Sequence, residues 1–197
     1  MNFFDRLAAA ITPEASDEDR ARARSEAQAL AQEDDWLGQA LDQHQQIETL
    51  FIEAKMAEGG DDRLMALRAL AQMLNAHAMA EEVVLYPALA RSGEKGDATM
   101  AYEEQSMTKV EMAGLEQLDP DSDEWAEKLE AIRKAVAHHV YEEESEWFPK
   151  LHRSLGESDA EMLSMRFEEE FGRLGDAAMD DYATGMTGQE SGGFTQH

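Results

Sequence analysis

Cysteine is absent from the sequence, and four prolines and 13 glycines among 197 residues leave few strong helix breakers. The lack of cysteine excludes disulfide bonds and thiolate metal sites. No apolar run approaches the roughly 20 residues that span a bilayer, and Asp5 and Arg6 interrupt the apolar stretch at the start of the chain, which is untypical of a secretory signal. We therefore expect a cytoplasmic protein.

Basic residues are also scarce, with 17 lysines and arginines against 43 acidic residues and a net charge of −26. A chain this acidic is repelled by nucleic acid and by anionic membranes, so neither is expected as a partner.

Good helix formers dominate what remains, and no segment alternates apolar and polar residues as a strand would. The pattern predicts an all-α protein: an antiparallel up-down four-helix bundle with extra N-terminal and C-terminal helices. Thr12 or Ser16, Asp61 or Asp62, Asp97, and Asp121 or Ser122 are the expected helix starts. The predicted helices cover residues 12 or 16 to 32, 34–58, 61 or 62 to 86, 97–118, 121 or 122 to 148, and 158–174.

The expected organisation is a helical extension (1–33), the bundle (34–153), a C-terminal helix (154–182) and a disordered tail (183–197). An apolar stripe near the N-terminus is expected to cap the bundle or to form the contact of a homodimer. It consists of Phe3, Phe4, Leu7 and Ile11.

One segment occurs twice, with a shift of 62 residues. The stretches that begin at His77 and at His139 both read His-x3-Glu-Glu-x2, an apolar residue, an aromatic residue, Pro, x, Leu. Residues four apart lie on one face of a helix, so His77 faces the same way as Glu81, and His139 the same way as Glu143.

Each of these pairs interrupts an apolar stripe that should face the core. A buried carboxylate costs several kcal/mol unless it is paired or bound to a metal, so two such pairs indicate metal ions between them. Imidazole and carboxylate together suit iron, manganese or zinc. His44 lies in a third apolar stripe and is the further candidate ligand, whereas His138, His152 and His197 are not expected to take part.

At these residues the chain resembles the hemerythrin family, in its bacterial hemerythrin-like HHE cation-binding branch, over about residues 35–153. The resemblance implies two non-haem iron ions in a four-helix bundle, or another divalent metal in their place. It implies that His44, His77 and His139 are terminal ligands and that Glu81 and Glu143 bridge the metals. It also implies that the small ligand is dioxygen, peroxide or nitric oxide.

The chain departs from the family at Gln105, where the third bundle helix usually has a histidine. Gln105 itself, Glu104, Tyr102 or water could replace it, and Tyr102 is favoured because it lies one turn before Gln105. An asymmetric centre is expected, with one metal bound less tightly. The alternatives to a protein that binds or reacts with oxygen species are a non-enzymatic iron or oxygen sensor, an interaction module, and a bundle with degenerate metal binding.

Overall fold

The computed structural model describes residues 15–32 and 35–187, with side-chain surroundings as far as residue 174. Over these ranges the chain is helical and has no strand, which confirms the all-α prediction. The elements are α2 (Asp17–Gln28), α3 (Trp36–Met56), α4 (Gly60–Ala80), η1 (Glu81–Leu85), α5 (Tyr86–Arg91), α6 (Lys95–Leu115), α7 (Asp123–Glu142), η2 (Glu143–Trp147), α8 (Phe148–Ser154) and α9 (Glu157–Thr187).

Side-chain caps begin three of these helices. Ser16, Asp35 and Ser122 each accept a hydrogen bond from a main-chain N–H in the first turn of α2, α3 and α7. The predicted caps of α4 and α6 are wrong: Asp61 and Asp62 lie inside the first turn of α4, and Asp97 lies inside that of α6, where their charges still suit the helix dipole. The alternative start at Thr12, and the apolar stripe from Phe3 to Ile11, lie outside the described residues.

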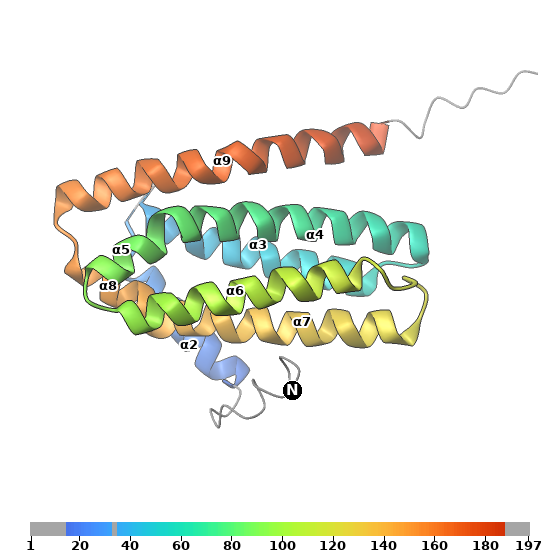
Figure 1. Ribbon diagram of the computed structural model, residues 1–197, viewed down its shortest axis with the longest axis horizontal. Coiled ribbons are helices and arrows are strands. Elements are labelled where there is room, and N and C mark those ends of the chain that lie inside the picture. Colours follow the sequence, from blue (N-terminus) through green and yellow to red (C-terminus); the bar gives the residue numbers. More distant parts are fainter. Residues whose placement is uncertain (1–14, 33–34, 188–197) are drawn as a thin grey trace, which may run out of the picture.

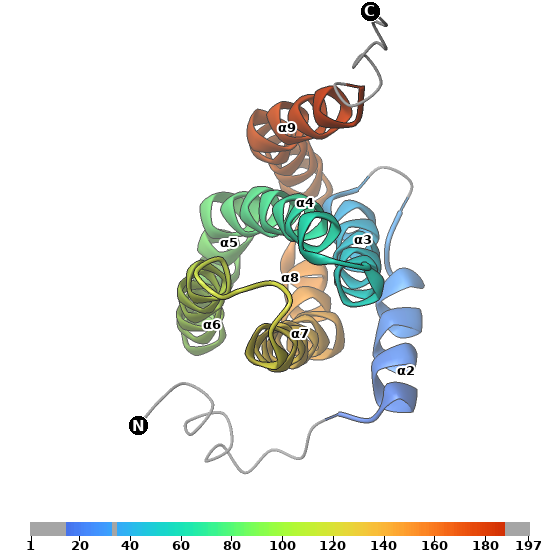
Figure 2. The same cartoon turned by 90° about the vertical axis from the view of Figure 1, so that its right-hand side faces the viewer.

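The helices α3, α4, α6 and α7 lie side by side, and successive ones are joined at alternate ends (Figure 1). Viewed from one end, α3, α4, α6 and α7 surround a common interior, α2 lies on the outer side of α3, and α9 lies beyond α4 (Figure 2). The C-terminal helix α9 continues past its predicted end at residue 174, to Thr187. No helix in the described ranges is long and apolar enough to cross a membrane.

A π-helical turn interrupts each half of the sequence repeat. η1 follows α4 and η2 follows α7, and in each the next helix, α5 or α8, has its proline in the first turn. The predicted helix ends at Tyr86 and Phe148 are therefore wrong, because the chain remains helical through Pro87 and Pro149. Proline lacks an N–H and clashes with the preceding turn of an α-helix, but at the first turn of a new segment it is well tolerated.

Two apolar clusters fill the interior and leave a polar layer between them. One surrounds Trp36, Leu85 and Phe148, and also takes in Phe167 from α9. The other surrounds Phe51 and Trp125. Along each long helix the polar residues of the interior lie between the two clusters, so the fold holds them away from both ends.

Candidate metal centre

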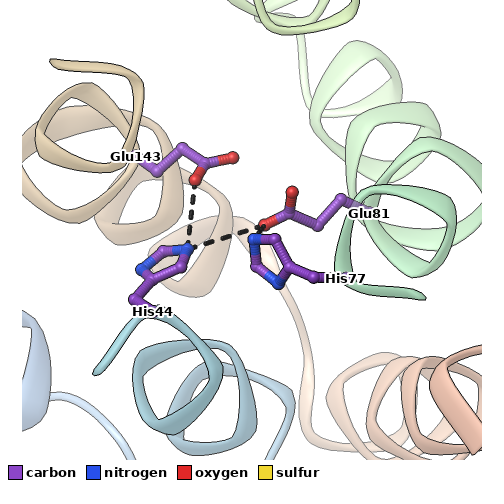
Figure 3. Close-up of side chains that lie close together, drawn as sticks. All are labelled: His44, His77, Glu81 and Glu143. Carbon is purple, nitrogen blue, oxygen red and sulfur yellow. Dashed lines mark ion pairs between the residues drawn. The ribbon is translucent and has the colours of Figure 1, made fainter. Parts of the chain in front are cut away.

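Four side chains of the polar layer converge on one point. His44 comes from α3, His77 from α4, and Glu81 and Glu143 are the first residues of the two π-helical turns (Figure 3). One ligand atom from each lies within 4.8 Å of all the others, and all four residues are buried. His44 Nε2 is 3.2 Å from Glu143 Oε2 and 3.8 Å from Glu81 Oε1, and His77 Nε2 is 3.2 Å from Glu81 Oε1.

His139, the fifth predicted residue, lies next to this group and faces the other side of the carboxylates. Its Nε2 is 3.4 Å from Glu143 Oε1. Glu81 thus presents one oxygen to His44 and His77, and Glu143 presents one oxygen to His44 and the other to His139. A carboxylate shared in this way can bridge two cations.

Each of the three histidines uses its other nitrogen to bind a neighbouring side chain. His44 Nδ1 lies 2.9 Å from Glu144 Oε1 and His77 Nδ1 lies 2.9 Å from Gln43 Oε1. His139 Nδ1 lies 2.7 Å from Glu104 Oε2. Carboxylate and amide oxygens only accept, so Nδ1 is the donor in each bond, and in the neutral form of each imidazole Nε2 keeps a lone pair that points into the site.

Three buried ligand atoms converge here without a hydrogen-bond partner among the described residues: His44 Nε2, Glu81 Oε1 and Glu143 Oε2. A buried polar atom without a partner costs about 1–3 kcal/mol, and a charged one more. All three are lone-pair donors, so a cation is the group that satisfies them together. The donor set therefore fits a divalent metal.

The site also perturbs the pKa values of its histidines. Burial lowers the pKa of His77 to about 4, against the raising effect of Glu81. Burial acts the same way on His139, but Glu143 and Glu104 outweigh it and raise its pKa to about 9. Burial lowers the pKa of His44 as well, but the nearby carboxylates of Glu143, Glu144 and Glu81 outweigh it and raise that pKa well above its ordinary value. The carboxylates thus attract positive charge to the centre of the helices.

The part of the chain that carries this arrangement matches a known protein family. The model of the hemerythrin HHE cation-binding domain matches residues 35–151. The chain belongs to the hemerythrin HHE cation-binding family. It is 27% identical over 125 residues to a protein named DNA nickase from Nostoc sp. (strain PCC 7120 / SAG 25.82 / UTEX 2576), a match that covers 64% of this chain and 36% of that protein. The chain thus spans about a third of the length of that relative. No solved structure matches it.

Gln105, which stands where hemerythrins usually have a histidine, does face the site. It is buried, and its amide Nε2 donates to Glu81 Oε2 and to the hydroxyl of Tyr86. The favoured substitute, Tyr102, is wrong: its hydroxyl donates to the main-chain oxygen of Glu82, and its side chain is 36% exposed. Glu104 binds His139 instead of entering the site.

The tyrosine that does reach the hemerythrin site is Tyr86, which the sequence patterns did not single out. Tyr86 is fully buried, and its hydroxyl lies 2.8 Å from Glu143 Oε1 and 3.0 Å from His139 Nε2. It follows Glu81 by five residues, a spacing that shares a face only when a π-helical turn intervenes. The sequence offered one sign that Tyr86 differs from its counterpart: it precedes Pro87, and the repeat places Phe148 at the equivalent position before Pro149.

Helix α2 contacts the site from outside the matched domain. Arg24 forms a salt bridge with Glu144 at 2.9 Å and a second one with Glu48 at 3.0 Å. Glu144 is 2% exposed and is the partner of His44 Nδ1. The positive charge of Arg24 thus reaches the metal-facing imidazole through one carboxylate.

A cavity of about 170 Å³ reaches the site from between α4, α6 and α7. His77, Gln105 and His139 are among its lining residues, and most of its remaining wall is apolar, including Leu74, Met112 and Val140. A cavity of this size and lining suits a small molecule of low polarity.

Proposed function

We propose that this protein holds two non-haem iron ions in an antiparallel up-down four-helix bundle formed by α3, α4, α6 and α7, and that it binds or reacts with dioxygen, peroxide or nitric oxide. The single observation that supports the proposal most strongly is the convergence of His44 Nε2, Glu81 Oε1 and Glu143 Oε2, buried and without partners among the described residues. Iron, when bound, supplies open coordination positions and redox chemistry for such ligands.

In this proposal the protein's own residues fall into two groups. His44 and His77 bind the first iron, His139 binds the second, and Glu81 and Glu143 bridge them. Gln43, Glu104 and Glu144 hold the three imidazoles in the tautomer that leaves Nε2 free to bind.

The apolar cavity supports a small uncharged ligand over an ionic one. Leu74, Met112 and Val140 are among its apolar lining residues, and the lysine in its wall, Lys109, is already paired with Glu82, so a charged substrate would lose much of its hydration there. We propose that the chain acts in the cytoplasm. The Nostoc relative is named a DNA nickase, but we propose that DNA is not a partner of this chain, because a net charge of −26 opposes binding to phosphates.

The test is a metal analysis of freshly purified protein, combined with optical spectra in air and after addition of peroxide or nitric oxide. We expect about two irons per chain and a spectrum that changes with these ligands. His77→Ala and His139→Ala should each lower the bound iron sharply, whereas His138→Ala, a change at the adjacent histidine, should not. Unchanged iron in both of the first two variants would place the metal elsewhere.

A further inference from the structure

The hydroxyl of Tyr86 lies at the second half of the site, among the atoms that face His139. It is 2.8 Å from Glu143 Oε1, 3.0 Å from Glu81 Oε2 and 3.0 Å from His139 Nε2. His139 Nε2 and Glu143 Oε1 are themselves 3.4 Å apart. Four potential ligand atoms, from α5, η1, α7 and η2, are therefore linked by distances of 2.8–3.4 Å.

These spacings match those of ligands around one metal. Ligand atoms about 2.1 Å from a metal lie about 3 Å apart when they are adjacent in an octahedral site. The hydroxyl of Tyr86 thus has the relation to His139 and the two carboxylates that a fellow ligand would have. The first half of the site has no counterpart, since the repeat places Phe148, which has no hydroxyl, at the position that corresponds to Tyr86.

The π-helical turn η1 is what directs Tyr86 inward. The main-chain N–H of Tyr86 donates to the carbonyl of Glu81, five residues earlier, so the two side chains lie on the same side of the helix. In a regular α-helix, five residues correspond to about 140° of rotation away from Glu81. Without the extra residue of this turn, the phenol ring would point away from the carboxylates.

We propose that Tyr86 is a ligand of the metal bound by His139, where its phenolate oxygen takes the place of the histidine that Gln105 replaces. The proposal rests on the metal centre proposed above. When the metal binds, the hydroxyl proton leaves to solvent and the metal takes its position against the oxygen. Gln105 then orients the tyrosine, because its amide donates to Tyr86 Oη at 2.6 Å and can continue to do so once the proton has left.

The structure separates Tyr86 clearly from the other tyrosine near the site. Tyr102 packs edge-to-face against the Tyr86 ring, with ring centroids 5.2 Å apart, but its hydroxyl is bound to the main chain on the far side. The pair Tyr86→Phe and Tyr102→Phe therefore removes one hydroxyl that reaches the site and one that does not, with the same chemical change.

The experiment loads the full-length protein and both variants with ferric iron and measures iron per chain and the visible spectrum. The unmodified protein should show an intense phenolate-to-iron band, and resonance Raman scattering excited in that band should show tyrosine ring modes. Tyr86→Phe should lose the band and bind the second iron about tenfold or more weakly, with the first retained. Tyr102→Phe should keep both.

The outcomes distinguish this proposal from the one it rests on. If the unmodified protein binds no iron, the metal centre itself is wrong. If it binds two irons but shows no phenolate band, or if Tyr86→Phe keeps the band, the centre stands and Tyr86 is not a ligand. Should Tyr86→Phe fail to fold, Gln105→Ala offers the second test: loss of its hydrogen bond should shift the band, and an unshifted band would contradict the proposed geometry.

Discussion

A histidine binds a metal through one ring nitrogen, and the partner of its other nitrogen decides which one. In this protein the three partners come from three different elements: Gln43 from α3, Glu104 from α6 and Glu144 from η2. Two of them are carboxylates, which make the imidazole a better electron donor. The affinity of the site for metal therefore depends on residues that do not touch the metal.

Glu104→Gln tests this dependence. The amide keeps the size of the side chain but loses its charge, so His139 becomes a weaker ligand, and the affinity for the second metal should fall about 10- to 100-fold. Competition with a chromophoric chelator measures it. Glu103→Gln is the matched control, because Glu103 is an exposed neighbour on the same helix. An equal loss of affinity in both variants would mean that only the net charge matters.

Sequence reasoning reached the residues whose spacing repeats and missed those whose position depends on three-dimensional contacts. The i, i+4 spacing places His77 and Glu81 on one face, and their convergence with His44 and Glu143 was expected from the apolar stripes. Gln43 and Glu104 obey no comparable rule, since each acts across a helix interface. Tyr86 was missed because the assumed rotation of 100° per residue fails inside η1.

Among the helical elements, α2 lies outside the matched domain but contacts the site through Arg24. Arg24 donates hydrogen bonds from Nε and Nη2 to the buried carboxylate of Glu144. Burial lowers the pKa of Arg24, but the hydrogen bonds of Glu48 and Glu144 outweigh it and raise that pKa further above its ordinary value. Glu144 is held ionised in turn, because the bonds of His44 and Arg24 lower its pKa against the raising effect of burial.

Arg24→Ala should therefore destabilise the fold by about 1–3 kcal/mol, because a buried carboxylate loses one of its two charged partners while it keeps His44. Urea unfolding of the metal-free protein measures the change. Arg22→Ala removes an exposed arginine of the same helix, which pairs only locally with Asp19, and should cost far less. Equal midpoints for the two variants would show that the contact of α2 with the site contributes little.

For the molecule as a whole, metal and fold should stabilise each other. Ligands from α3, from the α4–η1 segment and from the α7–η2 segment meet at one layer, and an ion that binds only the folded chain adds stability by mass action. Removal of metal with a chelator should lower the melting temperature, while far-ultraviolet circular dichroism at 20 °C stays helical because the two apolar clusters remain. An unchanged melting temperature after verified loss of metal would contradict this coupling.

The all-α class followed from composition, because long stretches of helix formers without strand periodicity allow little else. The placement of α9 did not follow, since its apolar residues fit several faces of a bundle equally well. Leu163 and Phe167 fix it, by inserting into the same cluster as Trp36 and Phe148. The shape of that cluster selects the position of α9, and the periodicity of the sequence does not reveal this shape.

The two π-helical turns occupy equivalent positions in the two halves of the sequence repeat. η1 begins at Glu81 and η2 at Glu143, with the same offset of 62 residues that separates His77 from His139. Such turns are rare and often lie at functional sites, and here they place a carboxylate at the same point of each half of the repeat. A chain in which residues 139–151 are replaced by a second copy of 77–89 should then still fold into helices, and loss of its helical circular dichroism would contradict the structural equivalence of the two segments. Tyr86 and Phe148 are equivalent positions of the two halves, and the hydroxyl oxygen that only Tyr86 carries makes the two sides of the site unequal.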